Sequence, residues 1–183
     1  MEVLALSGSL RNKSYNTALL NAAMGLAPSA VKISLFDALG EIPHFSPDLD
    51  APAVPASVLK LREAIGHADA VIISTPEYAH GIPGVLKNAL DWLVSSGEII
   101  LKPIAVMSVS TSELGGFRAQ ADLIKVLHAM NTSVVIEASL AVPFAKTSFD
   151  SDGKLVDVNT RQALQQSLAK VVQLVEQRKR ENG

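Results

Sequence analysis

Residues 3–20 read VLALSGSLRNKSYNTALL, and this segment joins an apolar run to a helical pattern through a loop of small and hydroxyl residues. The run Val3–Leu6 shows no polar alternation, which is typical of a strand that is covered on both faces. Apolar residues at helical spacing then continue to Leu26. The segment therefore predicts a strand, a loop and a helix, which is the repeating unit of a parallel sheet.

The same unit recurs along the chain. Continuous apolar runs at 70–73 and 104–107 predict buried strands, and the segment SVVI at 133–136 predicts a further strand. Val31, Ile33 and Leu35 alternate with polar residues, as in an edge strand. Amphipathic patterns predict helices over 14–26, 57–67, 84–95, 117–130 and 159–179. The order βαβαβαβαβα predicts a three-layer doubly wound α/β fold.

Two segments interrupt this order without marking a domain boundary. Residues 37–56 contain four prolines and predict a long irregular connection, and residues 143–158 are polar with a turn at Asp152-Gly153. Core-forming elements continue on both sides of each segment. We therefore expect residues 1–183 to form a single domain.

The composition excludes several classes of function. The net charge of −2 and the pI near 6.1 give no electrostatic footprint for nucleic acid or an anionic membrane. The absence of cysteine excludes disulfides, thiolate catalysis and cysteine-ligated metals. With no signal-like segment and no long apolar run, we expect a cytoplasmic protein.

Ligands of doubly wound folds bind outside the carboxyl ends of the strands. The loop at 7–17 offers Gly8 for a tight turn, Arg11 for charge, and several hydroxyl or amide donors before a helix N-terminus. It is neither a GxxxxGK[ST] nor a GxGxxG motif. The pattern fits a phosphate site and fits, equally well, a turn whose serines and asparagines cap a helix.

Two further loops follow the strands at 70–73 and 104–107. The loop at 74–84, STPEYAHGIPG, is stiffened by prolines and carries Tyr78, which suits a flat ring; we interpret His80 beside Glu77 as a polar loop histidine without a catalytic role. The loop at 108–119 contains Gly115-Gly116, which favours either close approach to a ligand or a flexible turn.

No catalytic or metal-binding motif accompanies these loops. GxSxG and HExxH are absent, the four histidines are scattered, and we assign no catalytic residue and no metal ligand. A binding crevice without a catalytic constellation is expected when a cofactor carries the chemistry. One loop for a phosphate and another for a flat ring indicate flavin mononucleotide (FMN).

The motifs together resemble the NADPH-dependent FMN reductases and their chromate-, quinone- and azo-reducing relatives. The matching segments are GSLRNKSYN at 8–16, PEYAHGIPGVLKNALDW at 76–92 and GGFRA at 115–119. The resemblance implies a flavodoxin-like fold with a five-stranded parallel sheet in the order 2-1-3-4-5. It also implies FMN as cofactor and NADPH or NADH as co-substrate.

The resemblance also implies the residues that bind FMN. The phosphate would be held by Ser9, Arg11, Ser14, Asn16 and Thr17, the ring edge by Pro76, Glu77, Tyr78 and Ala79, and the other side of the flavin by Ser110, Thr111, Ser112 and Gly115. Ala79 departs from the family, since many relatives have asparagine after PEY. Alanine cannot make the side-chain amide contact of an asparagine, which bears on the substrate face and on redox tuning.

The family further implies a homodimer, often a dimer of dimers, in which the 84–95 helix packs against its partner. The sole tryptophan, Trp92, would then be either an interface anchor or a buried core residue.

The implied activity is ping-pong transfer of hydride from NAD(P)H, through N5 of FMN, to a small acceptor such as a quinone, azo compound, chromate or free flavin. The alternatives are a flavodoxin-like electron carrier, which is usually more acidic, and a sensor that binds an anion without turnover.

Overall fold

A computed structural model of the protein describes residues 1–51 and 53–181. Its centre is a sheet in the order β2-β1-β3-β4-β5, with β6 also paired to β4, and every pair is parallel. The strands are β1 (Glu2–Ser7), β2 (Lys32–Phe36), β3 (Ala70–Thr75), β4 (Pro103–Val109), β5 (Ser133–Val134) and β6 (Leu140–Val142). The predicted doubly wound fold and its strand order are confirmed.

The fifth position of the sheet is shared by two short strands. β5 pairs with the start of β4 at Pro103 and Ile104, whereas β6 pairs with its end, at Met107–Val109. The 3₁₀ turn η2 (Ile136–Ala138) separates them and buries Ala138. The predicted strand over 133–136 therefore ends at Val134, because the chain leaves the sheet for one turn before it pairs with β4 again.

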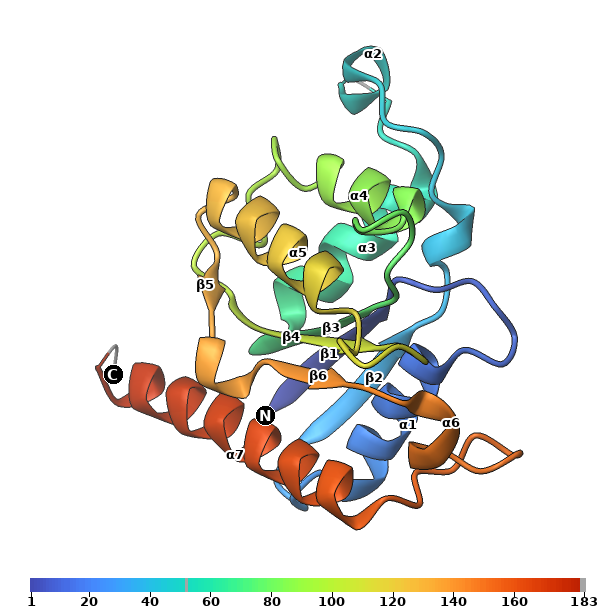
Figure 1. Ribbon diagram of the computed structural model, residues 1–183. Coiled ribbons are helices and arrows are strands. Elements are labelled where there is room, and N and C mark those ends of the chain that lie inside the picture. The colour runs from blue at the N-terminus through green and yellow to red at the C-terminus, as the bar shows by residue number, and fades with distance from the viewer. Residues whose placement is uncertain (52, 182–183) are drawn as a thin grey trace.

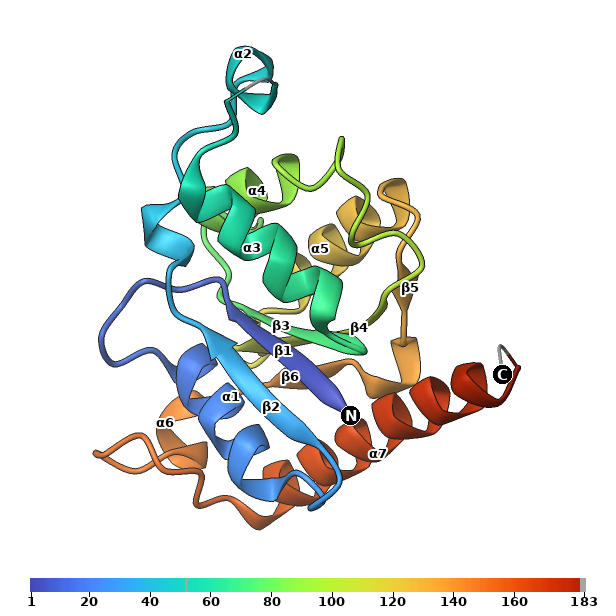
Figure 2. The same ribbon diagram turned by 180° about the vertical axis from the view of Figure 1, so that it is seen from behind.

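Helices cover both faces of the sheet (Figure 1). On one face lie α3 (Ala56–His67), α4 (Gly84–Asp91) and α5 (Phe117–Ala129), and on the other lie α1 (Tyr15–Leu26) and α7 (Val158–Glu181), as the reverse view confirms (Figure 2). The shorter helices are η1 (Leu39–Glu41), α2 (Pro47–Asp50) and α6 (Ala145–Ser148). Within residues 1–51 and 53–181, no helix is both long and apolar enough to cross a membrane.

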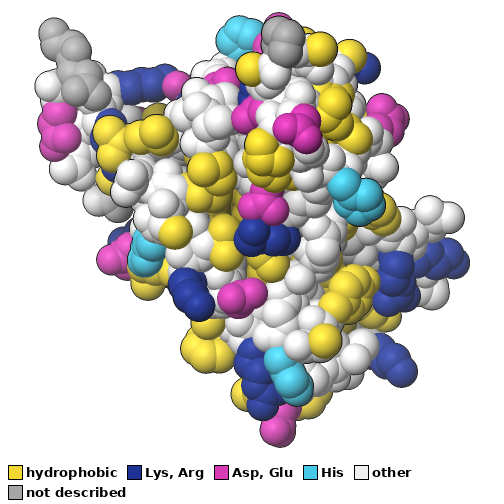
Figure 3. Space-filling view, turned by 90° about the horizontal axis from the view of Figure 1, so that it is seen from above, with side chains coloured by type: hydrophobic (Ala, Val, Ile, Leu, Met, Phe, Trp, Pro, Cys, Tyr) yellow, Lys and Arg dark blue, Asp and Glu magenta, His cyan; other side chains and the backbone are white. Residues whose placement is uncertain are grey.

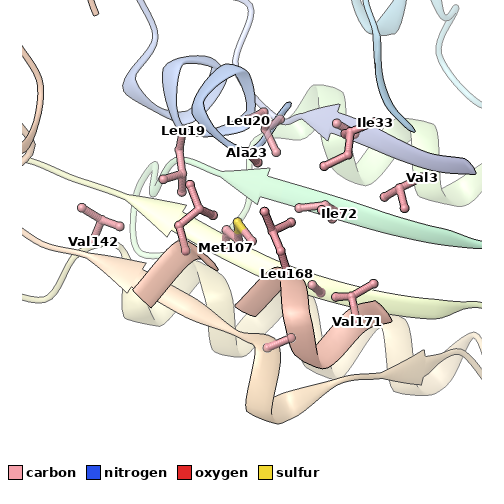
Figure 4. Packing of buried hydrophobic residues seen from close by; sticks show 14 of the residues in the cluster. Val3, Leu19, Leu20, Ala23, Ile33, Ile72, Met107, Val142, Leu168 and Val171 are labelled. Carbon is pink, nitrogen blue, oxygen red and sulfur yellow. The ribbon is translucent and has the colours of Figure 1, made fainter. Parts of the chain in front are cut away.

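Alternate residues of each central strand supply two separate hydrophobic cores. Val3 and Ala5 pack with Leu19, Leu20 and other residues of α1 and α7 (Figure 4), whereas Leu4 and Leu6 pack on the α3–α5 side. A strand needs apolar residues at every position when both of its faces are covered. This explains why β1, β3 and β4 show no polar alternation in the sequence.

Trp92, just after α4, is a core residue, and its interpretation as an interface anchor is wrong. Its side chain is fully buried, and its indole Nε1 donates a hydrogen bond of 2.8 Å to the carbonyl of Pro43. The ring of Phe45 packs edge-on against it at 5.1 Å. The indole thus holds down the proline-rich connection between β2 and α3, whose tip carries α2 away from the sheet (Figure 1).

Candidate functional site

Three loops meet at the carboxyl edge of the sheet. They are the first loop (residues 8–14), the second loop (76–83) and the third loop (110–116), which follow β1, β3 and β4. The strands end in register, since Ser7 lies opposite Ser74 and Thr75 opposite Ser108. The backbone N–H of Gly8 donates to the carbonyl of Ser74 at 2.8 Å. The first and second loops therefore start side by side at the topological switch point between β1 and β3.

The first loop places hydroxyl groups and cations around the N-terminus of α1. Ser14 caps this helix, because its Oγ accepts a hydrogen bond from the N–H of Thr17, and the Thr17 hydroxyl lies 2.7 Å from that of Ser7. Ser9 is buried, whereas Arg11 is exposed. The sequence suggested either a helix cap or a phosphate site in this loop. The structure shows the cap, and it lies beside the donors that would suit a phosphate.

The side chain of Asn16 connects the first turn of α1 to two neighbouring strands. Its Oδ1 accepts hydrogen bonds from the Ser74 hydroxyl at 2.9 Å and from the Val109 N–H at 3.0 Å, while its Nδ2 donates to the Val109 carbonyl at 3.1 Å. The residue is only 3% exposed. These bonds use the amide oxygen and one of the two Nδ2 hydrogens, and the side chain is almost fully buried, so we expect Asn16 to contact a phosphate through its backbone.

The fold brings acids to the first loop that the sequence did not suggest. A cleft of about 510 Å³ is lined by Arg11, Lys13 and neighbouring residues on one side, and by residues 150–153 on the other. Asp150 and Asp152 lie in this second wall. No acid is close to the first loop in the sequence, but the polar segment after β6 folds back beside it.

The second loop contains a tight turn in an unusual backbone conformation. The N–H and carbonyl groups of Tyr78 and Gly81 are paired with each other at 3.1 and 3.0 Å. Between them, Ala79 and His80 have φ angles of +50° and +65°. Two successive left-handed residues define a type I′ turn, in which asparagine and glycine are preferred.

The positive φ angle of Ala79 gives a physical reason why asparagine suits position 79 better than alanine. We expect Ala79→Asn to stabilise the apoprotein by about 0.5–1 kcal/mol, because asparagine tolerates the left-handed region better than alanine. Ala79→Val should destabilise it, because a branched Cβ is crowded there. Thermal unfolding of the three apoproteins gives the order, and a valine variant as stable as the asparagine variant would refute this explanation.

Glu77 joins the second loop to α5. Its Oε2 accepts hydrogen bonds from the backbone N–H groups of Arg118 at 3.1 Å and Ala119 at 3.4 Å, and its Oε1 lies 3.2 Å from Nδ1 of His80. An Arg118 guanidinium nitrogen lies 3.0 Å from the same His80 nitrogen. Nδ1 can donate to Glu77 or accept from Arg118, but not both at once. From the sequence alone, His80 was interpreted as a polar loop residue without a role. In the structure its ring contacts both Glu77 and Arg118.

The charge of Glu77 is favoured in the folded protein. Burial raises the pKa of this carboxyl, but the hydrogen bonds from His80 and from the N–H groups of Ala119 and Arg118 outweigh it, and the pKa of Glu77 lies below its ordinary value of 4.5. The stability that these bonds contribute is present above pH 4.5 and is lost as the pH falls through the lowered pKa.

The third loop is held against β6. Ser110 donates its N–H to the Val142 carbonyl, and the Ser110 hydroxyl lies 3.1 Å from that of Ser112. At Gly115, where φ is +60°, a Cβ would come within 2.8 Å of the Val142 carbonyl carbon. Glycine is therefore required at position 115 because the backbone at Val142 leaves no room for a side chain, whether or not a ligand is bound. Thr111 and Ser112 remain exposed beside it.

Known proteins resemble the chain along most of its length. A family model described as NADPH-dependent FMN reductase matches residues 1–147. An NAD(P)H-dependent FMN reductase of Pseudomonas aeruginosa is 38% identical over 170 residues, 92% of this chain and 91% of that protein. A quinone reductase of Pseudomonas putida is 35% identical over 173 residues, 89% of this chain and 88% of that protein.

Solved structures of flavoproteins have the same fold as this chain. FerB of Paracoccus denitrificans, described as a flavoenzyme NAD(P)H:acceptor oxidoreductase, superimposes with a TM-score of 0.87 at 32% identity, over 96% of this chain and 97% of that one. A WrbA-like flavodoxin of Agrobacterium tumefaciens, at 17% identity and a TM-score of 0.61 over 96% and 97% of the two chains, supports the fold alone.

The fold, with its three loops at the carboxyl edge of the sheet, defines a flavodoxin-like protein. The chain belongs to the NADPH-dependent FMN reductase family. The predictions of this family, of an oxidoreductase, and of FMN with NAD(P)H as cofactors are thereby confirmed.

The residues present fit FMN. The first loop offers a phosphate two cations, Arg11 and Lys13, beside serine and threonine hydroxyls at a helix N-terminus. The second loop offers a ring the exposed segment Tyr78–His80. The hydroxyl of Ser108, buried at the end of β4, has no hydrogen-bond partner among the described residues, and it lies beneath Gly116 of the third loop, where an added Cβ would come within 3.4 Å of it.

Proposed function

We propose that the chain is an FMN-dependent NAD(P)H oxidoreductase that reduces quinones and similar small, flat acceptors. The observation that carries this proposal is the meeting of three dissimilar loops at one edge of the sheet, where a donor-rich helix N-terminus adjoins a rigid loop with an exposed aromatic side chain. Two relatives of the chain are described as an FMN reductase and a quinone reductase, which supports the same activity.

The proposal gives each loop a part in binding FMN. In the first loop and the turn after it, Ser9, Arg11, Ser14 and Thr17 hold the phosphate with their side chains, and Asn16 with its backbone. The ring lies along Pro76–Ala79, which contact it mainly through backbone groups. Ser110, Thr111, Ser112 and Gly115 close over its other side. Rigid loops lower the ordering cost of binding and fix the ring relative to incoming substrates.

The chain itself supplies a surface on which flat molecules can stack. Leu10, Tyr78, Leu114 and Phe117 all belong to or adjoin the three loops, and each is at least 44% exposed. FMN, when bound, would supply the redox chemistry, as a carrier of two electrons between NAD(P)H and the acceptor. The apolar side chains would place nicotinamide and acceptor at the same face in turn, which is the basis of a ping-pong order.

Steady-state kinetics tests this order. With NADPH or NADH varied at several fixed concentrations of a quinone, an azo dye, chromate or free flavin, we expect parallel double-reciprocal lines and the highest kcat/KM for a quinone. Intersecting lines would contradict the ping-pong order. Reduction of the protein by a separate reductase, but not by NAD(P)H, would instead favour the electron carrier.

We also propose that residues 1–183 act as one FMN-binding domain that forms a homodimer, or a dimer of dimers, through the 84–95 segment. Trp92 is buried and does not serve this contact. Apolar side chains that could meet a second copy are exposed in and after this segment, namely Val94 (63%), Ile100 (51%) and Leu101 (67%). Apolar side chains also lie among charged ones on the surface seen from the side of α2 (Figure 3). Light scattering of wild type and Val94→Glu tests this, with a smaller mass expected for the variant; equal masses would contradict the contact.

A further inference from the structure

Helix α5 begins without a cap of its own. Its N-cap residue is Gly116, which has no side chain, and its first turn contains no acid. The first N–H groups of a helix need acceptors from elsewhere, and the positive end of the helix dipole favours an anion. Glu77 supplies both, because its Oε2 accepts from Arg118 and Ala119.

The capping carboxylate comes from a different loop, the one that follows β3. Glu77 follows Pro76 in the second loop, whereas α5 follows the third loop directly. The Glu77 side chain is 17% exposed, so much of it lies between the two loops. A hydrogen bond across this gap fixes how far apart the two loops stand.

Among the residues that the structure describes, two ionisable side chains approach Oε1 of Glu77. His80 approaches Oε1 from the second loop at 3.2 Å, and the Arg118 guanidinium approaches it from α5 at 3.8 Å. Asp122, one turn further along α5, is directed to the N–H of Ile82 at 3.5 Å. The second loop is thus tied to α5 at two places, and Glu77 is the tie nearer to the third loop.

We propose that Glu77 is a positioning residue for the flavin ring, which sets the separation of the second and third loops by capping α5 rather than by contacting the ring with its carboxylate. This inference rests on the proposed function. Without the carboxylate, the first N–H groups of α5 turn to water and the third loop loses its fixed distance from the second. Part of the binding energy must then be spent on ordering the loops.

The test uses variants of matched charge. Glu77→Gln keeps the size of the side chain and an oxygen that can accept from both N–H groups but removes the charge, and Glu77→Ala removes the cap altogether. Glu113→Gln makes the same charge change in the third loop itself, at an exposed residue. Dissociation constants for FMN and for riboflavin, which lacks the phosphate, are measured by fluorescence quenching on apoproteins well below their melting temperatures.

We expect Glu77→Ala to weaken FMN and riboflavin by a similar factor of about fivefold or more, as loss of a helix cap predicts. Glu77→Gln should weaken both ligands less, but by more than about twofold, because the helix dipole loses its anion, and Glu113→Gln should stay within about twofold of wild type. A loss confined to FMN would show an electrostatic effect on the phosphate and overturn the proposal. So would unchanged dissociation constants with a lowered melting temperature, which would indicate a structural role only. If Glu77→Ala does not fold, Glu77→Gln decides alone.

Wild-type binding separates this inference from the proposed function. If the wild type binds neither FMN nor riboflavin, the proposed function fails. If it binds both and the Glu77 variants bind them as tightly, only the role of Glu77 is refuted.

Discussion

Replacement of Asn16 by alanine is expected to lower the free energy of unfolding by about 2–4 kcal/mol. The amide satisfies the Ser74 hydroxyl and both backbone groups of Val109, and alanine leaves all three without their partner. Because Asn16 is 3% exposed, water does not readily replace it. Urea denaturation of the apoprotein measures the loss.

Asn12→Ala is the matched control, because Asn12 is an exposed asparagine of the same loop. Its free energy of unfolding should stay within about 0.5 kcal/mol of wild type. An Asn16 variant as stable as the Asn12 variant would mean that the amide does not connect α1 to the two strands. The contrast matters for function, because these strand ends support all three loops of the candidate site.

Arg11→Ala should have the second large effect, this time on ligand binding. Removing a guanidinium that makes charge-assisted hydrogen bonds to a phosphate is expected to raise the dissociation constant of FMN roughly 10- to 100-fold. Within residues 1–51 and 53–181, the Arg11 side chain makes no hydrogen bond or ion pair, so the unfolding midpoint should not change. Titration of the apoprotein with FMN gives the first quantity and thermal unfolding the second.

Lys13→Ala tests whether the planar guanidinium of Arg11 matters for binding beyond its positive charge. Lys13 lines the same cleft and carries the same charge, but it offers a flexible ammonium in place of a planar fork. We expect its loss to weaken FMN by less than about threefold. If Arg11→Ala retains FMN as tightly as wild type, the phosphate does not lie on the first loop.

The sequence predicts the sheet well for a physical reason. Strands covered on both faces need continuous apolar residues, and Val3–Leu6 and 70–73 show them without ambiguity. The division of the fifth strand was not predictable, since Val135 and Ile136 continue the apolar run and the turn that follows depends on packing beneath the sheet. The place of Trp92 depended likewise on Phe45 and Pro43, far away in the sequence.

The candidate site was predictable as a set of loops but not in its internal connections. Strand ends in a parallel sheet lie together, so loops at 7–17, 74–84 and 108–119 had to meet. The bonds of the Asn16 amide were not predictable, because nothing local in the sequence shows that Val109 lies beside it. Two glycines before α5 do signal a helix without its own cap, and that signal could have drawn attention to Glu77.

The central claim is that this chain holds FMN at the carboxyl edge of its sheet and reduces it with NAD(P)H. The most direct measurement is the visible absorption spectrum of the purified protein, loaded with FMN and then mixed with NADPH or NADH without oxygen. We expect a bound yellow chromophore that bleaches with the nicotinamide alone. A protein that stays colourless and cannot be loaded with FMN would contradict it.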